Sequence, residues 1–279
     1  MKVLHILSLS LLISLSLFAK GIAAISPADK VITDILDKNI SYNTSMQNLQ
    51  ALMDKKIDFA IINSDDAYAI KKSSPNLRTL VALYPKMLAF ITKKGSNIPS
   101  ILDLNDKKKA CYTSKGTQSL CKKIFSTWDI SHKYIHVSFD EAKKQLEQGK
   151  VSGILSLEGH PNQDIEQLNK ELSITFVPLY GKKFDQLKND FPFILKGGMP
   201  KGVYQGLERD IKSIGIKALL VTREDVNEKM VQTVTQTILE NIKDIKKRNF
   251  IYRGISKKTL LEGLIFPLHQ GAIKAFNAH

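Results

Sequence analysis

One apolar run that ends abruptly at polar residues is the clearest feature of the hydrophobic pattern. Residues 57–62 read IDFAII, and Ser64, Asp65 and Asp66 follow one residue later. Such a run is typical of a strand covered on both faces, and its polar end marks where the strand leaves the sheet. Because residues 46–56 have a helical pattern, the stretch predicts a helix–strand unit with polar side chains at the carboxyl end of the strand.

A second stretch repeats this design 94 positions later. LEQGK at residues 146–150 leads into VSGIL at residues 151–155, and the run ends at Glu158, Gly159 and His160. In open α/β sheets ligands bind at the carboxyl ends of the strands, so two such units facing each other predict a cleft. The alternative is a chance similarity between two ordinary helix–strand units.

The remaining pattern completes an α/β protein and suggests how it divides. Strands are predicted at residues 22–25, 77–83, 88–92, 110–112, 134–137, 174–179 and 216–222, and helices at residues 28–36, 67–72, 118–125, 138–148, 184–190 and 225–247. Lys93, Lys94 and Gly95 mark a crossing between units. We expect a first unit over residues 20–94, a second over residues 95–203, and a return to the first over residues 204–279.

The first 19 residues have the pattern of a targeting segment. Lys2 supplies a positive charge, residues 3–18 are apolar apart from His5 and several serines, and Ala19 is a small residue at the cleavage site. The run is short for a membrane span. We therefore expect a cleaved signal peptide and a periplasmic protein that starts near Lys20; an uncleaved anchor is the alternative.

The charge balance is basic, with 41 lysines and arginines against 27 acidic residues and a formal net charge of +14. The basic residues are mostly lysines scattered through helical stretches, such as Lys143, Lys144, Lys243, Lys246 and Lys247. They come with few arginines and no aromatic stacking pattern, so nucleic acid is not an expected partner. We expect a solvated lysine-rich surface on an exported protein.

Another polar stretch follows ACY at residues 110–112. Thr113, Ser114, Lys115, Gly116 and Thr117 form a hydroxyl-rich turn ahead of the next predicted helix. Amides at a helix N-terminus favour an anion, and the lysine adds positive charge. The turn lacks the Walker spacing, so it predicts an anion site or an ordinary βα turn rather than phosphate chemistry.

Cys111 and Cys121 are the two cysteines of the chain. In an oxidising compartment they are candidates for a disulfide between a strand end and the following helix, and two buried thiols are the alternative. Their spacing is not that of a metal site, and we expect neither a metal nor a cofactor.

Several motifs, taken in order, resemble the TAXI family of TRAP-transporter solute-binding proteins. They are IDFAIINSDDAYA, NLRTLVALYP, CYTSKGT, LEGHPNQDI, FVPLYG, FPF with GGMPKGVY, IGIKALLVTREDV and, most specific, IFPLHQGAIKAF, and they cover most of residues 41–276. The resemblance implies a two-lobed, type II-like periplasmic binding protein with a ligand cleft between the lobes. It also implies a small organic anion as ligand, such as glutamate or a related dicarboxylate, and a TRAP permease as partner.

Three loops depart from the family pattern where a ligand would be held. Residues 22–27 lack the glycine-rich loop with its tyrosine pair, and residues 43–46 read NTSM where the family has threonine-glycine-glycine-serine. Residues 114–118 read SKGTQ where it has glycine-serine-glycine, often followed by arginine. Missing glycines remove close backbone approach, and a missing arginine removes a bidentate carboxylate partner. The family resemblance therefore does not determine the identity of the ligand.

The leading hypothesis is an extracytoplasmic solute-binding protein that hands an organic anion to a membrane permease, with hinge segments near Phe90 and Pro200. Each expected ligand contact could instead cap or close its loop. The contacts are Thr44, Ser45, Ser64, Asp65, Thr113, Ser114, Lys115, Gly116, Thr117, Gly159, His160, Asn162 and, at the cleft edge, Tyr204.

Two other classes of protein compete with this hypothesis. A periplasmic sensor that presents itself to a membrane kinase is the alternative, because the anion-binding loops are altered. An enzyme is not expected: the chain has no nucleophile elbow, HExxH or dinucleotide loop, and a pair of Asp65 with His160 specifies no reaction.

Overall fold

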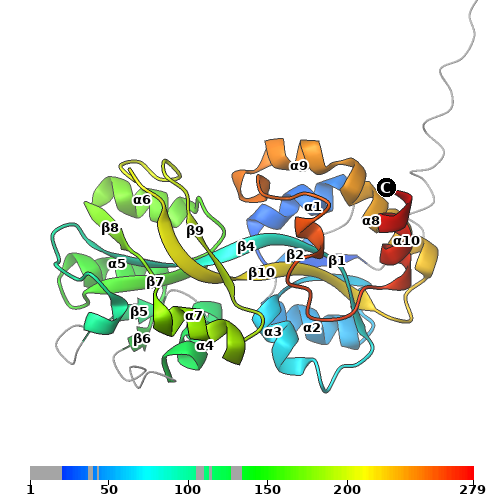
Figure 1. Ribbon diagram of the computed structural model, residues 1–279, viewed down its shortest axis with the longest axis horizontal. Coiled ribbons are helices and arrows are strands. Elements are labelled where there is room, and N and C mark those ends of the chain that lie inside the picture. Colours follow the sequence, from blue (N-terminus) through cyan, green and yellow to red (C-terminus); the bar gives the residue numbers. More distant parts are fainter. Residues whose placement is uncertain (1–20, 37–39, 43, 105–109, 113–114, 127–133) are drawn as a thin grey trace, which may run out of the picture. The chain divides into compact units, whose positions relative to one another are not determined.

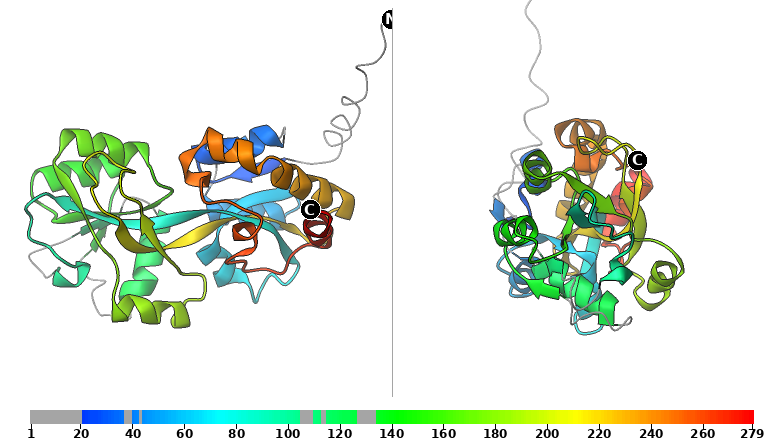
Figure 2. Two further views of the ribbon diagram at one scale, coloured as in Figure 1. Left: turned by 45° about the horizontal axis from the view of Figure 1, so that its top comes forward. Right: turned by 90° about the vertical axis from the view of Figure 1, so that its left-hand side faces the viewer.

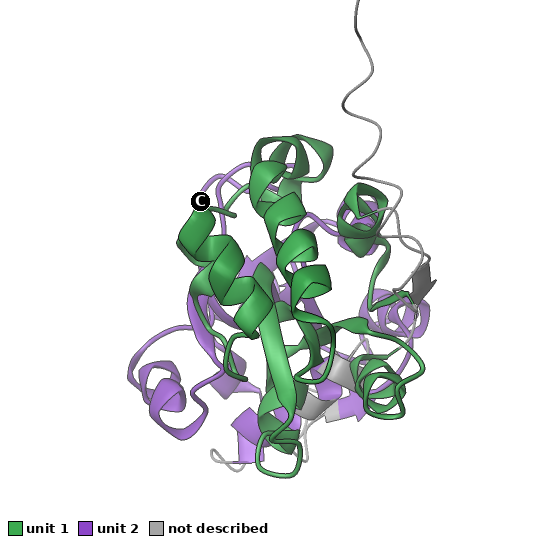
Figure 3. Ribbon diagram, turned by 90° about the vertical axis from the view of Figure 1, so that its right-hand side faces the viewer, with its two compact units in different colours: residues 1–84, 217–279 green, residues 85–216 purple. Residues whose placement is uncertain are grey.

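The computed structural model describes residues 21–36, 40–42, 44–104, 110–112, 115–126 and 134–279. The chain divides into two compact units (Figure 1, Figure 3). Unit 1 comprises Met1–Tyr84 and Lys217–His279, and unit 2 comprises Pro85–Ile216. Among the described residues, no helix has both the length and the apolar character needed to span a membrane.

Unit 1 is a mixed sheet with helices packed on it. Its elements are β1 (Ile22–Ala24), α1 (Lys30–Ile35), β2 (Ile40–Tyr42), α2 (Ser45–Met53), β3 (Phe59–Asn63), α3 (Ser64–Ile70), the first part of β4 (Leu77–Lys93), the last part of β10 (Ile211–Arg223), α8 (Glu228–Glu240), α9 (Ile242–Arg248) and α10 (Gln270–Ala278). β1 is parallel to β2 and β3, and β10 is antiparallel to β3. Phe59 and Ile61 share a core with α1, α8, α9 and α10, whereas Ala60 and Ile62 alternate to the opposite face of the strand.

Unit 2 is built on the other parts of β4 and β10. Its further elements are β5 (Ala110–Tyr112), α4 (Lys115–Ser126), β6 (Tyr134–His136), α5 (Phe139–Glu147), β7 (Gly153–Glu158), α6 (Gln163–Glu171), β8 (Ile174–Val177), α7 (Lys182–Asp190) and β9 (Leu195–Met199). β5 is parallel to β6 and β7, β4 is antiparallel to β7 and β8, and β9 is antiparallel to β10. Figure 2 shows α6 and α7 on opposite sides of these strands.

The chain passes between the units at other positions than predicted. β4 is one continuous strand rather than two runs on either side of Tyr84 and Pro85, and the chain enters unit 2 between these two residues. The proline is exposed, and a strand tolerates proline where its missing N–H is not needed for pairing. The chain returns within β10, after Ile216. The predicted hinge positions near Phe90 and Pro200 therefore lie inside unit 2.

Two helices, α3 and α4, begin a full three residues earlier than predicted and include residues expected in loops. α3 starts at Ser64, with Asp65 and Asp66 in its first turn, where acidic side chains favour the helix dipole. α4 starts at Lys115.

The helix expected over residues 225–247 is two helices, α8 and α9, which meet at Asn241. β2, α6 and β9 form where no element was predicted.

The C-terminal motif IFPLHQGAIKAF has a structural role in unit 1. A Cβ on Gly271 would lie 2.3 Å from the carbonyl oxygen of Glu228, so α10 approaches α8 as closely as only glycine allows. His269 caps α10: its Nδ1 accepts from the Gly271 amide at 3.1 Å, and its Nε2 donates to the Glu224 carbonyl at 3.2 Å. Desolvation lowers the pKa of His269, which keeps Nδ1 available as an acceptor.

Gly271→Ala should lower the free energy of unfolding by about 1–3 kcal/mol, because the added methyl group forces α10 away from α8. Urea denaturation of the purified protein measures this change. Gly254→Ala is the matched control, since a Cβ there meets nothing within 4 Å and the expected change is within about 0.5 kcal/mol. Equal effects of the two substitutions would contradict the packing account.

Candidate functional site

In unit 1, the N-terminus of α2 is attached to the carboxyl end of β3. Thr44 is the N-cap of α2: its Oγ1 accepts from the Gln47 amide at 3.3 Å, and its own amide donates to Gln47 Oε1 at 3.0 Å. Ser45 is buried, and its Oγ accepts from the Asn63 amide at 2.9 Å. Both hydroxyls, expected as ligand contacts, cap the helix or hold it on the strand.

Ser64 and Asp65 are buried in the first turn of α3. Ser64 Oγ accepts from the Lys217 amide at 3.1 Å and so connects α3 to β10. The buried Lys217 side chain donates from Nζ to the Thr259 carbonyl at 2.8 Å. Desolvation lowers the pKa of Lys217, and the negative charge of Glu262 opposes this shift. Unit 1 thus places a buried carboxyl group just after the carboxyl end of β3 and a buried lysine on the neighbouring strand β10.

Two buried amides near this end of β3 each have an oxygen that no donor among the described residues reaches. Asn48 Nδ2 donates to the carbonyls of Ala24 at 2.9 Å and Ile61 at 3.1 Å, which orients the amide and leaves Oδ1 unpaired. Asn63 Oδ1 is buried and unpaired in the same way. Such acceptors are costly unless a water or a ligand supplies a donor. Neither residue was predicted as a ligand contact, although Asn63 directly precedes the polar residues Ser64 and Asp65.

In unit 2, the N-terminus of α4 is attached to β7. Thr117 is fully buried, and its Oγ1 accepts from the Leu157 amide at 3.1 Å. Because β5 and β7 are parallel, their carboxyl ends lie at one edge of the sheet, where α4 begins. Lys115 and Gly116 form the first turn of α4. Residues 113–114 and the Lys115 side chain lie outside the described part of the chain.

His160, Asn162 and Tyr204 form a closed hydrogen-bond network after β7. His160 Nε2 donates to the Met87 carbonyl at 3.0 Å, so the neutral ring accepts at Nδ1, where the Tyr204 hydroxyl donates at 2.5 Å. The same hydroxyl accepts from the Asn162 amide at 2.9 Å. The side chains of His160 and Tyr204 are buried, and these contacts use both ring nitrogens and the phenol.

Burial holds both rings of this network in their neutral forms. Desolvation lowers the pKa of His160 to about 4, and the hydrogen bond to Met87 opposes the shift. Desolvation also raises the pKa of Tyr204, whose ring stacks on Phe176 with centroids 5.1 Å apart. The network therefore connects three segments of unit 2 rather than presenting free polar atoms.

Gly159 and Asn162 complete the set of predicted residues in unit 2. Gly159 follows directly on β7 and leads to the histidine of the network. Asn162 is the N-cap of α6, and its Oδ1 accepts from the Ile165 amide at 3.1 Å. Most of the predicted residues that the structure describes therefore lie after a strand, and Tyr204 contacts two of them. Most of their described side chains cap a helix or connect two segments.

Cys121 is a free thiol in the structure, fully buried in α4. Desolvation raises its pKa, so the unreactive protonated form is favoured. The side chain of Cys111, its predicted disulfide partner, lies outside the described residues. The structure therefore does not show the predicted bond.

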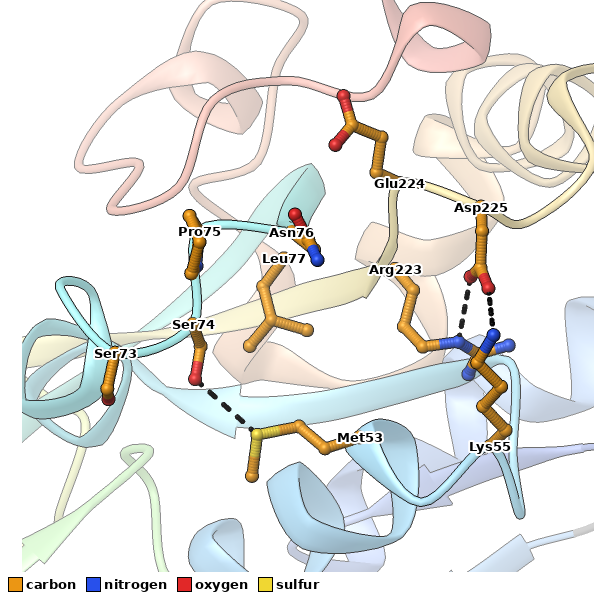
Figure 4. Close-up of a pocket in the computed structure, with 10 residues that line it drawn as sticks. All are labelled: Met53, Lys55, Ser73, Ser74, Pro75, Asn76, Leu77, Arg223, Glu224 and Asp225. Carbon is orange, nitrogen blue, oxygen red and sulfur yellow. Dashed lines mark hydrogen bonds and ion pairs between the residues drawn. The ribbon is translucent and has the colours of Figure 1, made fainter.

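A surface hollow of about 460 Å³ lies at the amino end of β3 (Figure 4). The strand register places Thr222 opposite Phe59 at that end and Ala218 opposite Asn63 at the carboxyl end. None of the predicted ligand contacts lines this hollow. Its lining residues are Met53, Lys55, Ser73, Ser74, Pro75, Asn76, Leu77, Arg223, Glu224 and Asp225.

Solved structures share this fold at low sequence identity. A Xanthomonas citri protein bound to ATP is similar with a TM-score of 0.55 and 11% identity, over 92% of this chain and 98% of that one. The probable amino-acid ABC transporter extracellular-binding protein ytmK of Bacillus subtilis has a TM-score of 0.51 and 13% identity, over 84% and 97%. An ancestral arginine-binding protein bound to arginine has a TM-score of 0.50 and 16% identity, over 81% and 96%. The predicted α/β fold of solute-binding proteins is confirmed.

The family assignment comes from the sequence. The NMT1-like family matches residues 18–278, a span that contains every predicted ligand contact in both units. This assignment is broader than the TAXI resemblance. With almost the whole sequence matched, the chain belongs to the NMT1-like family.

Proposed function

We propose that the protein is an extracytoplasmic solute-binding protein that captures a small organic anion and delivers it to a membrane permease. The observation that carries the proposal is a binding-protein fold in which both units place polar residues at the carboxyl ends of their strands. The motifs that resemble the TAXI family favour a permease of the TRAP type, and residues 1–19 favour export. Two solved structures of this fold are named as binding proteins, which supports binding rather than catalysis.

The ligand class that we infer is an amino acid. In unit 1, the buried carboxyl group of Asp65 and the unpaired Asn63 Oδ1 offer acceptors, which suit a ligand ammonium group. In unit 2, the amides at the N-terminus of α4 and the charge of Lys115 suit a carboxylate. An amino acid carries both groups, whereas a plain dicarboxylate offers nothing to the acceptors of unit 1.

Calorimetry against a panel of amino acids and dicarboxylates should detect an amino acid as the tighter ligand. Lys115→Ala and Asp65→Asn should each weaken its binding by at least about tenfold, roughly 1.4 kcal/mol, because each removes one charged partner. The matched controls are Lys122→Ala, at an exposed position of the same helix, and Asp66→Asn, in the same helical turn. Both controls should bind like the wild type.

Three outcomes would count against parts of this proposal. Binding that neither Lys115→Ala nor Asp65→Asn weakens would place the site elsewhere. Preference for a plain dicarboxylate would overturn the ligand class but not the transport role. If nothing on the panel binds, the sensor that acts on a membrane kinase becomes the better hypothesis.

A further inference from the structure

Almost all the excess positive charge of unit 1 lies in one short segment. Residues 242–258, called the basic segment below, contain seven basic residues and one acidic residue. The rest of unit 1 contains 13 basic and 12 acidic residues. The net positive charge of this unit is therefore concentrated in the basic segment, because acidic residues balance the basic ones elsewhere.

Buried apolar side chains anchor the basic segment and leave its charges outside. Ile245, Ile251, Tyr252 and Ile255 belong to the core of unit 1. On α9 three lysines are three and four positions apart, so they lie on one face of the helix. The exposed basic residues are Lys243, Lys247, Arg248, Arg253, Lys257 and Lys258, and Lys246 is half-buried.

The lysines of the basic segment form no ion pair with the described residues. Arg248 Nε donates to Asp244 Oδ2 at 2.7 Å, and the Arg253 guanidinium lies 4.0 Å from the centre of the Phe250 ring. Like charges four residues apart, such as Lys243 and Lys247, destabilise a helix. The described part of the fold thus holds these lysines without an anionic partner, which points to an external one.

We propose that the basic segment is a docking surface for the anionic headgroups of a phospholipid membrane. Clustered lysines on flexible stems are attracted to a negatively charged lipid surface, each adding to the affinity. Within the segment no large apolar side chain is strongly exposed, so the surface adsorbs by charge rather than by insertion. A nucleic-acid surface would use more arginine and aromatic stacking than this segment contains.

The position of the basic segment supports a membrane partner. The Tyr252 hydroxyl donates to the Ala28 carbonyl at 3.4 Å, and α9 contacts α1. Figure 1 shows α9 beside α1, in the first elements after the apolar run of residues 1–19. During export, an apolar run inserted in the membrane would keep the elements that follow it, including α1, near the membrane surface. The basic segment lies close to these elements. This proposal does not depend on the ligand proposed above.

Vesicle flotation of the full-length chain tests the docking surface. Vesicles of phosphatidylglycerol mixed with phosphatidylcholine should bind the protein more tightly than phosphatidylcholine alone, and added salt should weaken the difference. A variant with Lys243→Gln, Lys246→Gln, Lys247→Gln and Lys258→Gln should lose at least about tenfold of the affinity for anionic vesicles. Glutamine retains helix propensity, and circular dichroism checks that the variant is folded.

The matched control removes the same charge from unit 2. Lys122→Gln, Lys150→Gln, Lys183→Gln and Lys188→Gln alter four exposed lysines and should retain most of the binding. An equal loss in the control would show a non-specific charge effect and overturn the proposal. So would equal binding to neutral and anionic vesicles, or binding to soluble poly-glutamate without binding to vesicles, which would indicate an acidic protein partner instead.

Discussion

Acidification from about pH 6.5 to about pH 4 should lower the free energy of unfolding by about 3 kcal/mol through His160 alone. Burial lowers the pKa of this histidine to about 4 in the folded protein, from an ordinary value of 6.5. Between these two pH values His160 binds a proton in the unfolded chain but not in the folded protein. Stability is therefore fully present above pH 6.5, falls as the pH is lowered, and loses nothing more through this group below pH 4.

Urea denaturation at a series of pH values measures the effect of His160. His160→Gln should flatten the curve between these pH values, because glutamine stays neutral while it retains an amide donor for Met87 and an acceptor for Tyr204. His136→Gln is the matched control, since His136 is exposed. If the wild type and His160→Gln lose the same free energy of unfolding on acidification, the neutral His160 is not the cause of the pH dependence.

Arg223→Met should lower the free energy of unfolding by about 3–5 kcal/mol. The guanidinium donates to the carbonyls of Leu52 at 2.9 Å and Ile57 at 2.6 Å, and to Asp58 Oδ1 at 3.0 Å. The Arg223 and Asp58 side chains are only 11% and 9% exposed. Removal of the guanidinium takes one charged donor from a buried carboxylate and two carbonyls, and methionine supplies none.

A second arginine–aspartate pair provides the control for Arg223. Arg248 and Asp244 lie four residues apart on α9, and each side chain is 45% exposed. Arg248→Met should cost at most about 0.5 kcal/mol, because water solvates both groups when the pair is broken. Denaturant unfolding of both variants gives the comparison. Similar losses would mean that burial of the Arg223 pair does not determine its contribution.

Local patterns were sufficient for the elements whose burial follows from neighbouring residues. The apolar run before Ser64 predicted β3, and the capping residue Ser138 predicted the start of α5. β9 was missed because LKGGM has no strand pattern of its own; it forms by pairing with β10. Propensity is a weak guide where a distant partner supplies the hydrogen bonds.

The sequence indicated that polar residues follow several strands, but the uses of their side chains were not evident. Polar residues after a buried strand can face a ligand or cap the next helix, and Thr44 and Thr117 do not differ in sequence in a way that decides between these uses. Thr44 pairs with Gln47 three residues away, whereas Thr117 pairs with Leu157, 40 residues away. Only the first partner is close enough in the chain to be expected from a sequence pattern.

By itself, the sequence determined the α/β class, the positions of the polar strand ends and the excess of lysine, because these depend on composition and on short-range periodicity. The tertiary structure decided which groups meet over long separations. His160 is neutral and closed off because Met87 and Tyr204, 73 and 44 residues away, take both ring nitrogens. The charges of residues 242–258 stay at the surface of unit 1 because four buried side chains hold that segment on the core. Burial and long-range pairing set the charge state and exposure of each group, and neither can be read from its neighbours in the chain.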